Sequence, residues 1–179
     1  GSEIIGKSAI APNRGNEIPI LPAEFVEPGM GTGLVMSVPA HAPKDYQALM
    51  DLKAKNHELA SKIEPIPIIV TPGYDVFPAK QICEKLGVSN QTDEKLEEAT
   101  KELYLKEFTD GKLNEKCDIF NNEKVQFGRD KVREWLQENN HLEKFPVLEN
   151  APVHCRCGAE CVVKILNNQI GRASCRERV

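Results

Sequence analysis

Residues 31–49, GTGLVMSVPAHAPKDYQAL, constrain the fold more than any other part of the chain. Their first three residues predict a turn, because glycine permits positive φ and lets the backbone approach a ligand closely. The apolar run at residues 34–38 predicts a short buried strand. Prolines bracket the Ala-His-Ala that follows, and the second of them, Pro43, favours the start of a helix. The stretch thus predicts a strand-to-helix corner, a common ligand-binding position in α/β proteins.

Two polar residues lie at this corner. Asp45 falls in the first turn of the predicted helix, where exposed backbone N–H groups favour a negative charge. Its carboxylate could bind an ammonium group, or it could only complement the helix start. His41 could orient a ligand or act as an acid or base, or it could be a neutral ring bonded to nearby backbone.

The remaining pattern favours a mixed α/β fold. Short apolar runs alternate with prolines before residue 30, and PIPIIV at residues 65–70 predicts a second strand. Helical spacing continues from Pro43 to Ile63. Two helices are expected next, a short one from residue 78 to Gly87 and a longer one from Thr92 to Gly111. A third helix is expected at about 128–140, with Val132, Trp135 and Leu136 packed into the core. Two strands joined at Gly158 should follow, the second at 161–166.

Changes in composition divide the chain into four predicted parts. They are a strand-rich part with the Gly-Thr-Gly motif at 1–70, a helical insertion at 71–142, an exit hairpin at 143–169 and a tail at 170–179. The tail, IGRASCRERV for residues 170–179, loses the apolar period of the preceding chain. We expect this tail, like the Gly1-Ser2 start, to be vector-encoded and to lie outside the fold.

Composition limits the classes of function. The chain is 40% hydrophobic and 28% charged, as in ordinary globular domains. No apolar run reaches the roughly 20 residues that a membrane span needs, so we expect a cytoplasmic protein without membrane contact. The net charge of -4 argues against a large nucleic-acid surface, although it allows a local contact with one nucleotide end.

The six cysteines are expected to be reduced thiols rather than a disulfide framework. Four residues suggest a zinc site in the predicted hairpin: His154, Cys155, Cys157 and Cys161. Structural zinc sites usually combine two distant ligand pairs, whereas alternation in a hairpin sends neighbouring side chains to opposite faces. We therefore predict buried thiols and no metal, with zinc as the alternative.

Residues 31–49 resemble the editing domain of leucyl-tRNA synthetases, specifically the archaeal and eukaryotic cytosolic type. EIPILPAEFVEPGMGTG at 17–33 is similar to the approach to that motif, and residues 128–169 are similar to the exit from the domain. The resemblance covers nearly everything from Ile4 to Gln169. It implies a strand-rich, barrel-like editing body with a helical insertion and a C-terminal β-hairpin that leads back to the catalytic domain.

The resemblance implies an activity. The parent would be a class I leucine–tRNA ligase, and this segment would hydrolyse tRNA(Leu) mischarged with an amino acid close to leucine. Such editing is needed because a missing methylene is worth only about 1–3 kcal/mol in an apolar pocket. The implied partners are the mischarged 3′ end of tRNA(Leu) and the rest of the synthetase chain. Editing implies no cofactor, and ATP and Mg²⁺ belong to the parent's synthetic reaction alone.

The resemblance also assigns roles by position. Asp45 is implied as the catalytic carboxylate that holds the substrate's α-ammonium, so that water attacks a fixed ester carbonyl. The implied substrate-binding residues line the pocket and the place of the terminal adenosine: Gly31, Thr32, Gly33, Met36, Ser37 and His41.

Two features of the family are missing from this sequence. They are an upstream threonine-rich editing segment and the nucleotide-binding signatures of the synthetic site. We therefore expect the isolated chain to be a poor hydrolase or none, and not to aminoacylate. The alternative function is a non-catalytic tRNA-binding or interaction module from the same region.

Overall fold

The computed structural model describes residues 2–12, 15–26, 32–143, 154 and 156–158. The chain divides into two compact units, Gly1–Leu142 and Glu143–Val179. The helices and strands of the described residues all lie in the first unit. The finer division of the chain at residues 70 and 169 stays a prediction.

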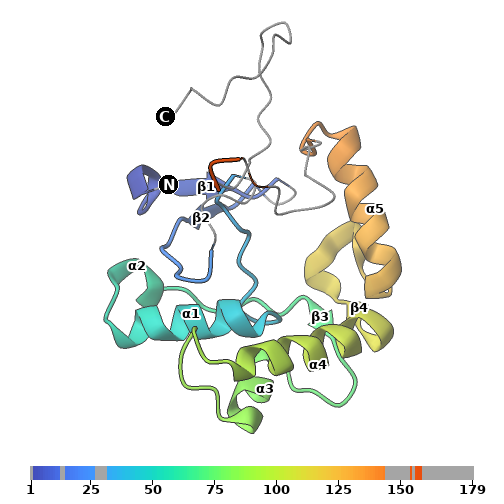
Figure 1. The fold of residues 1–179 in the computed structure, drawn as a ribbon. Helices are drawn as coiled ribbons and strands as arrows, with labels where there is room; N and C mark the ends of the chain where they lie inside the picture. The colour runs from blue at the N-terminus through green and yellow to red at the C-terminus, as the bar shows by residue number, and fades with distance from the viewer. Residues whose placement is uncertain (1, 13–14, 27–31, 144–153, 155, 159–179) are drawn as a thin grey trace, which may run out of the picture. The chain divides into compact units, whose positions relative to one another are not determined.

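The N-terminal part forms a small hairpin. After the 3-10 helix η1 (Ser2–Ile4), strands β1 (Ser8–Ile10) and β2 (Glu17–Pro19) pair antiparallel, with Ala9 opposite Ile18 (Figure 1). The side chains of β1 are exposed and those of β2 are exposed or half-buried. The hairpin therefore adds little to the core.

Side-chain hydrogen bonds tie the N-terminal segment to the helices. The Glu24 N–H donates to Gln91 Oε1 at 3.0 Å, and the Gln91 N–H donates to Asp51 Oδ2 at 2.9 Å. Gln47 Nε2 donates to the other Asp51 oxygen at 3.0 Å. Gln47 and Gln91 are buried, so this chain of bonds satisfies polar groups that have little access to water.

Three helices pack together to form the core of the first unit (Figure 1). They are α1 (Pro43–Ala54), α3 (Pro78–Leu86) and α4 (Lys95–Asp110). The core side chains are each at most 2% exposed: Ala79, Ile82, Cys83, Leu96, Ala99 and Leu103. Among the described helices, none has both the length and the apolar character needed to cross a membrane.

Local sequence signals set the ends of these helices. Pro43 and Pro78 stand at the starts of α1 and α3, where a missing N–H breaks no helical bond. Gly87 caps α3 with a left-handed φ of 65°. Both predicted helix ends are confirmed, because α3 ends at its cap Gly87 and α4 ends before Gly111.

The first helix is shorter than its apolar spacing predicts. α1 ends at Ala54, and Asn56 has a φ of 55° before the short helix α2 (Glu58–Ser61) begins. Asparagine adopts this left-handed conformation more readily than most residues do. The predicted continuation of helical structure to Ile63 is therefore wrong, because the chain turns at Asn56 while the apolar spacing continues.

Residues 34–38 are not the predicted buried strand. They belong to no helix and to no strand pairing in the described part of the chain. Their apolar side chains are exposed, at 51% for Leu34, 60% for Val35, 58% for Met36 and 38% for Val38. The prediction is wrong here because a strand needs a hydrogen-bonding neighbour, which apolar composition alone does not supply.

The second predicted strand is shorter than expected. Of residues 65–70, only β3 (Ile69–Val70) pairs, antiparallel with β4 (Lys112–Leu113). Gly111 precedes β4, and a Cβ built there would lie 2.3 Å from the Glu107 carbonyl oxygen and 2.8 Å from Ile69 Cγ2. The end of α4 thus approaches β3 so closely that only glycine fits at this position.

The last helix of the first unit agrees with its prediction. The 3-10 helix η2 (Glu115–Phe120) leads to α5 (Val125–Glu138), three residues ahead of the expected start. The stripe expected to pack in the core is only half-buried: Val132, Trp135 and Leu136. The ring of Trp135 stacks on that of His141, with 6.1 Å between the ring centroids.

Some predicted features lie outside the described residues, namely Gly31, Cys155 and the strand at 161–166. Gly158 is described, and its φ of 81° suits the predicted turn. The mixed α/β class holds for the described part of the chain. The barrel-like body and the C-terminal hairpin stay predictions.

Candidate functional site

The Pro-Ala-His-Ala-Pro corner lies in the interior of the first unit. Its buried residues are each at most 3% exposed: Ala40, His41, Ala42 and Pro43. The Ala40 carbonyl oxygen accepts from the Ala79 N–H of α3 at 3.1 Å. Because proline fixes φ on either side, the corner is a rigid loop bonded to a neighbouring helix.

Asp45 is held against the same loop. Its Oδ2 accepts from the Val38 N–H at 2.7 Å, and the Ser37 side chain also bonds to the carboxylate. Asp45 is 7% exposed. Burial raises the pKa of Asp45 above its usual value, and the hydrogen bonds from Val38 and Ser37 offset part of this effect. The carboxylate is thus oriented and poorly solvated, which strengthens its attraction for a cation.

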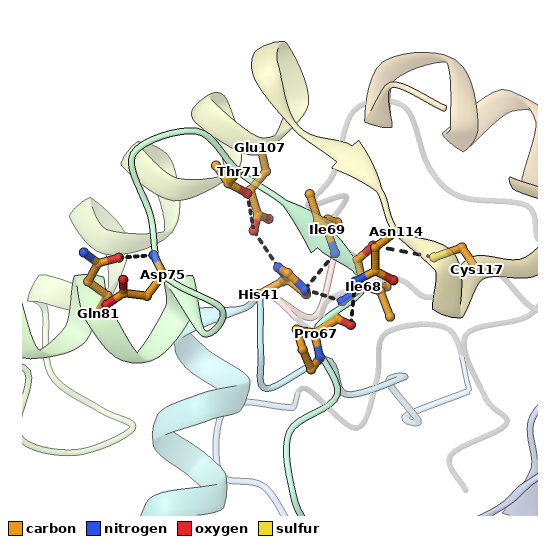
Figure 2. A network of polar contacts seen from close by, with 10 residues as sticks. All are labelled: His41, Pro67, Ile68, Ile69, Thr71, Asp75, Gln81, Glu107, Asn114 and Cys117. Atoms are coloured by element: carbon orange, nitrogen blue, oxygen red, sulfur yellow. Dashed lines mark hydrogen bonds and ion pairs between the residues drawn. The ribbon is translucent and has the colours of Figure 1, made fainter. Parts of the chain in front are cut away.

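His41 uses both ring nitrogens inside the protein (Figure 2). Nε2 accepts from the N–H groups of Ile68 at 2.8 Å and Ile69 at 3.2 Å. Nδ1 lies 2.6 Å from Glu107 Oε1. Because Nε2 accepts, the ring hydrogen is assigned to Nδ1, which donates to Glu107. This is the alternative of a ring bonded to nearby groups, and it leaves neither nitrogen open to a ligand.

Glu107 is a residue that the sequence analysis missed. It is 4% exposed, and the buried Thr71 Oγ1 lies 3.5 Å from the same carboxylate oxygen that His41 contacts. The buried positions of α4 recur every three or four residues: Leu96, Ala99, Leu103 and Glu107. An acidic residue on an apolar stripe requires a polar partner, so this spacing was a usable signal.

The structure brings three of the predicted site residues together around Val38, namely Ser37, His41 and Asp45. Met36 precedes them in the exposed run. At the start of that run, Gly33 has the expected positive φ of 70°, and Thr32 Oγ1 accepts from the Leu34 N–H at 3.3 Å.

A hollow of about 850 Å³ lies elsewhere, between α3, α4 and the loop before α3. Its polar groups bond to one another: Glu102 Oε1 accepts from Tyr74 Oη at 3.1 Å and from Lys85 Nζ at 2.8 Å. None of the predicted site residues lines this hollow. We therefore locate the candidate site at the corner, where the oriented carboxylate lies.

The described residues contain no group of three or more His, Cys, Asp or Glu side chains that could hold a metal ion. Of the four residues that suggested zinc, only His154 and Cys157 are described, so the absence of zinc stays a prediction. Cys83 and Cys157 are free thiols. Burial raises the pKa of the Cys83 thiol to about 11, which leaves it unreactive at neutral pH.

Known proteins resemble this chain along most of its length. The family model for the leucyl-tRNA synthetase editing domain matches residues 3–66. The leucine–tRNA ligase of Methanocaldococcus jannaschii is 45% identical over 170 residues, and that of Methanococcus aeolicus is 44% identical over 169. Both alignments cover 94% of this chain. The chain belongs to the leucyl-tRNA synthetase family, as part of its editing domain.

Solved structures of leucyl-tRNA synthetase editing domains agree. The crystal structure of GlLeuRS-CP1 matches with a TM-score of 0.71 and 28% identity, over 83% of this chain and 61% of that one. An editing domain of the P. falciparum cytosolic leucyl-tRNA synthetase matches with a TM-score of 0.62 and 26% identity, over 69% and 41%. These matches favour the predicted editing-domain segment over a non-catalytic module.

The chain spans only part of its relatives. It covers 18% of the length of the M. jannaschii ligase and 17% of the M. aeolicus ligase. The resemblance predicted from residues 31–49 is confirmed at the level of the family and the domain.

Proposed function

We propose that this segment hydrolyses the ester of tRNA(Leu) mischarged with an amino acid close to leucine, within a class I leucine–tRNA ligase. One observation carries the proposal. In a chain that matches the editing domain, the Asp45 carboxylate is buried at the start of α1 and oriented by the Val38 N–H at 2.7 Å.

Asp45 binds the α-ammonium of the mischarged amino acid. Its limited access to water strengthens this ion pair relative to one at the protein surface. The bound ammonium fixes the ester carbonyl, so that a water molecule attacks in a defined geometry. The water oxygen bonds to the carbonyl carbon, the bond to the ribose oxygen breaks, and a proton from the water ends on that ribose oxygen.

The run before the corner binds the remainder of the substrate. Met36 and Ser37 line the amino acid pocket, and the exposed apolar atoms of residues 34–38 suit an aliphatic side chain. Gly31, Thr32 and Gly33 receive the terminal adenosine, since glycine lets the backbone approach the ligand. His41 supports this pocket from the interior of the protein, because its ring nitrogens bond to Ile68, to Ile69 of β3 and to Glu107 of α4.

The proposed partners follow from the reaction. They are the mischarged 3′ end of tRNA(Leu) and the remainder of the synthetase chain, in the cytoplasm. Asp45 and a water molecule carry the hydrolysis without a metal or cofactor. ATP and Mg²⁺ take part only in aminoacylation by the whole enzyme.

The test is Asp45→Asn in the full-length synthetase that carries this segment. We expect hydrolysis of mischarged tRNA(Leu) to fall by about 100-fold or more, because a substrate that is no longer fixed loses that much rate. Leucylation should stay normal. Asp130→Asn, at an exposed aspartate of α5, is the matched control and should hydrolyse at the wild-type rate. Normal hydrolysis by Asp45→Asn would refute the proposed role of this carboxylate.

A further inference from the structure

Three segments far apart in the sequence meet at the His41 ring (Figure 2). His41 lies on the corner before α1, Glu107 lies in α4, Ile69 begins β3, and Ile68 directly precedes that strand. The side chains of His41 and Glu107 are 4% and 6% exposed. Water has little access to these contacts, so the ring is fixed from two sides by the protein itself.

The Glu107 carboxylate and the backbone N–H groups of Ile68 and Ile69 together select the tautomer of His41. With an acceptor 2.6 Å from Nδ1, the ring hydrogen stays on that nitrogen, and Nε2 keeps its lone pair for two backbone N–H groups. The other tautomer would point an N–H at those donors and a lone pair at the carboxylate. Loss of the Glu107 acceptor leaves the buried Nδ1–H without its partner, because the backbone N–H groups of Ile68 and Ile69 still hold the lone pair of Nε2, and it loosens the anchor of the corner.

Val38 connects this corner to Asp45. Its carbonyl oxygen accepts from the N–H groups of His41 and Ala42, each at 2.9 Å. Its own N–H donates to Asp45 Oδ2 at 2.7 Å. A shift of the His41 backbone thus changes the direction of the N–H that orients the carboxylate. A displacement of about 1 Å at a reacting centre can lower a rate by about 100-fold.

We propose that Glu107 is a positioning residue for Asp45, acting through the His41 ring and the Val38 peptide. This role deepens the proposed editing function and rests on it. It makes the helical part of the chain a support of the site, because α4 supplies the acceptor that holds the corner in place.

Two variants of the full-length synthetase test the role. Glu107→Met removes the acceptor, and we expect the kcat of mischarged-tRNA hydrolysis to fall by about 10- to 100-fold, as when other outer supports of a site are removed. KM should change little, because Glu107 supports Asp45 from the interior and does not contact the substrate in the proposed site. Glu107→Gln keeps a neutral acceptor and should lower kcat only about threefold. Leucylation should stay normal in both.

A second measurement follows the mechanism directly. In the ¹⁵N-labelled chain of this sequence, NMR should find the His41 hydrogen on Nδ1 with the downfield ¹H shift of a short hydrogen bond, and Glu107→Met should lose that shift. The matched control is Glu98→Gln, at an exposed glutamate of the same helix, which should change neither hydrolysis nor the Nδ1–H shift. A wild-type His41 that carries its hydrogen on Nε2 would overturn the proposal.

The outcomes separate this proposal from the proposed function. Wild-type hydrolysis in Glu107→Met, alongside lost hydrolysis in Asp45→Asn, would overturn the positioning role alone. Normal hydrolysis in both variants would overturn both proposals. If Glu107→Met is not recovered folded, Glu107→Gln decides: a lower kcat with normal leucylation supports the role, and a wild-type kcat contradicts it.

Discussion

Residues 32–38 and residues 39–45 are neighbours in the sequence but differ in how the fold uses them. The first segment exposes its apolar side chains, whereas the second buries even its histidine and its aspartate. The difference shows that hydrogen bonds within the first unit orient the Asp45 carboxylate before any substrate binds. Beside this carboxylate, the exposed side chains of Leu34, Val35 and Met36 have no long-range hydrogen-bonded support from the described residues.

The range of the hydrogen bonds explains this difference. The bond from His41 to Glu107 joins residues 66 positions apart, and the bond from Ile68 to His41 joins residues 27 apart. In the exposed segment, Thr32 bonds to Leu34, two positions away. Long-range bonds fix a segment within the fold, and a local turn fixes only itself.

Removal of the His41 ring should give the largest effect. We expect His41→Ala to lower the free energy of unfolding by about 3–5 kcal/mol, because it leaves the buried Glu107 carboxylate without its partner. Urea unfolding of the chain measures this value. His141→Ala, at an exposed histidine, should lose less than about 1 kcal/mol. Equal losses of unfolding free energy in the two variants would mean that the buried corner stabilises the fold no more than a surface histidine does.

The same substitution on either side of the corner should give unequal effects. Leu49→Ala, at a leucine that is 5% exposed in α1, should lower the free energy of unfolding by about 2–5 kcal/mol. Leu34→Ala, at 51% exposure, should stay within about 0.5 kcal/mol. Urea unfolding again measures both. A loss of several kcal/mol at Leu34 would mean that residues 34–38 are buried in solution.

The pH dependence of Asp45 should give the smallest effect. Its pKa is raised by burial, so the folded state holds the proton more tightly than the unfolded state does. Its contribution to stability is therefore present below the unfolded-state pKa and is lost as pH rises through the folded-state pKa. Asp45→Asn does not ionise and escapes this loss. The stability of the wild type relative to Asp45→Asn should thus fall as pH rises from about 3 to 7.

Urea unfolding of both proteins at several pH values measures this difference. The Val38 N–H can still donate to an asparagine oxygen, so the variant keeps the main hydrogen bond of the native side chain. A relative stability that rises with pH would show that ionised Asp45 is favoured by folding, against the direction given by its burial.

Sequence reasoning located the helices better than the strands. Pro78, Gly87 and Gly111 act on their immediate neighbours, so they revealed the ends of α3 and α4 directly. Residues 34–38 have a strand-like composition, but pairing depends on partners that local sequence does not specify. The turn at Asn56 was missed because the apolar spacing continued past it.

The candidate site shows the same limit. The corner, Asp45 and the two alternatives for His41 could be read from residues 31–49. The bonds that occupy both ring nitrogens come from the backbone of Ile68 and Ile69 and from Glu107, and the approach of Glu107 depends on how α4 packs against α1. In the sequence, only the position of Glu107 on the apolar stripe of α4 indicates that this residue is buried and needs a polar partner.

The bond between the Val38 amide and Asp45 has a practical consequence. An amide chemical shift responds to the charge of the oxygen that its hydrogen contacts. The amide resonance of Val38 should therefore follow the ionisation of Asp45 in an ordinary pH titration. It should move again when an amino acid ester with a free ammonium is added, without any label on the ligand.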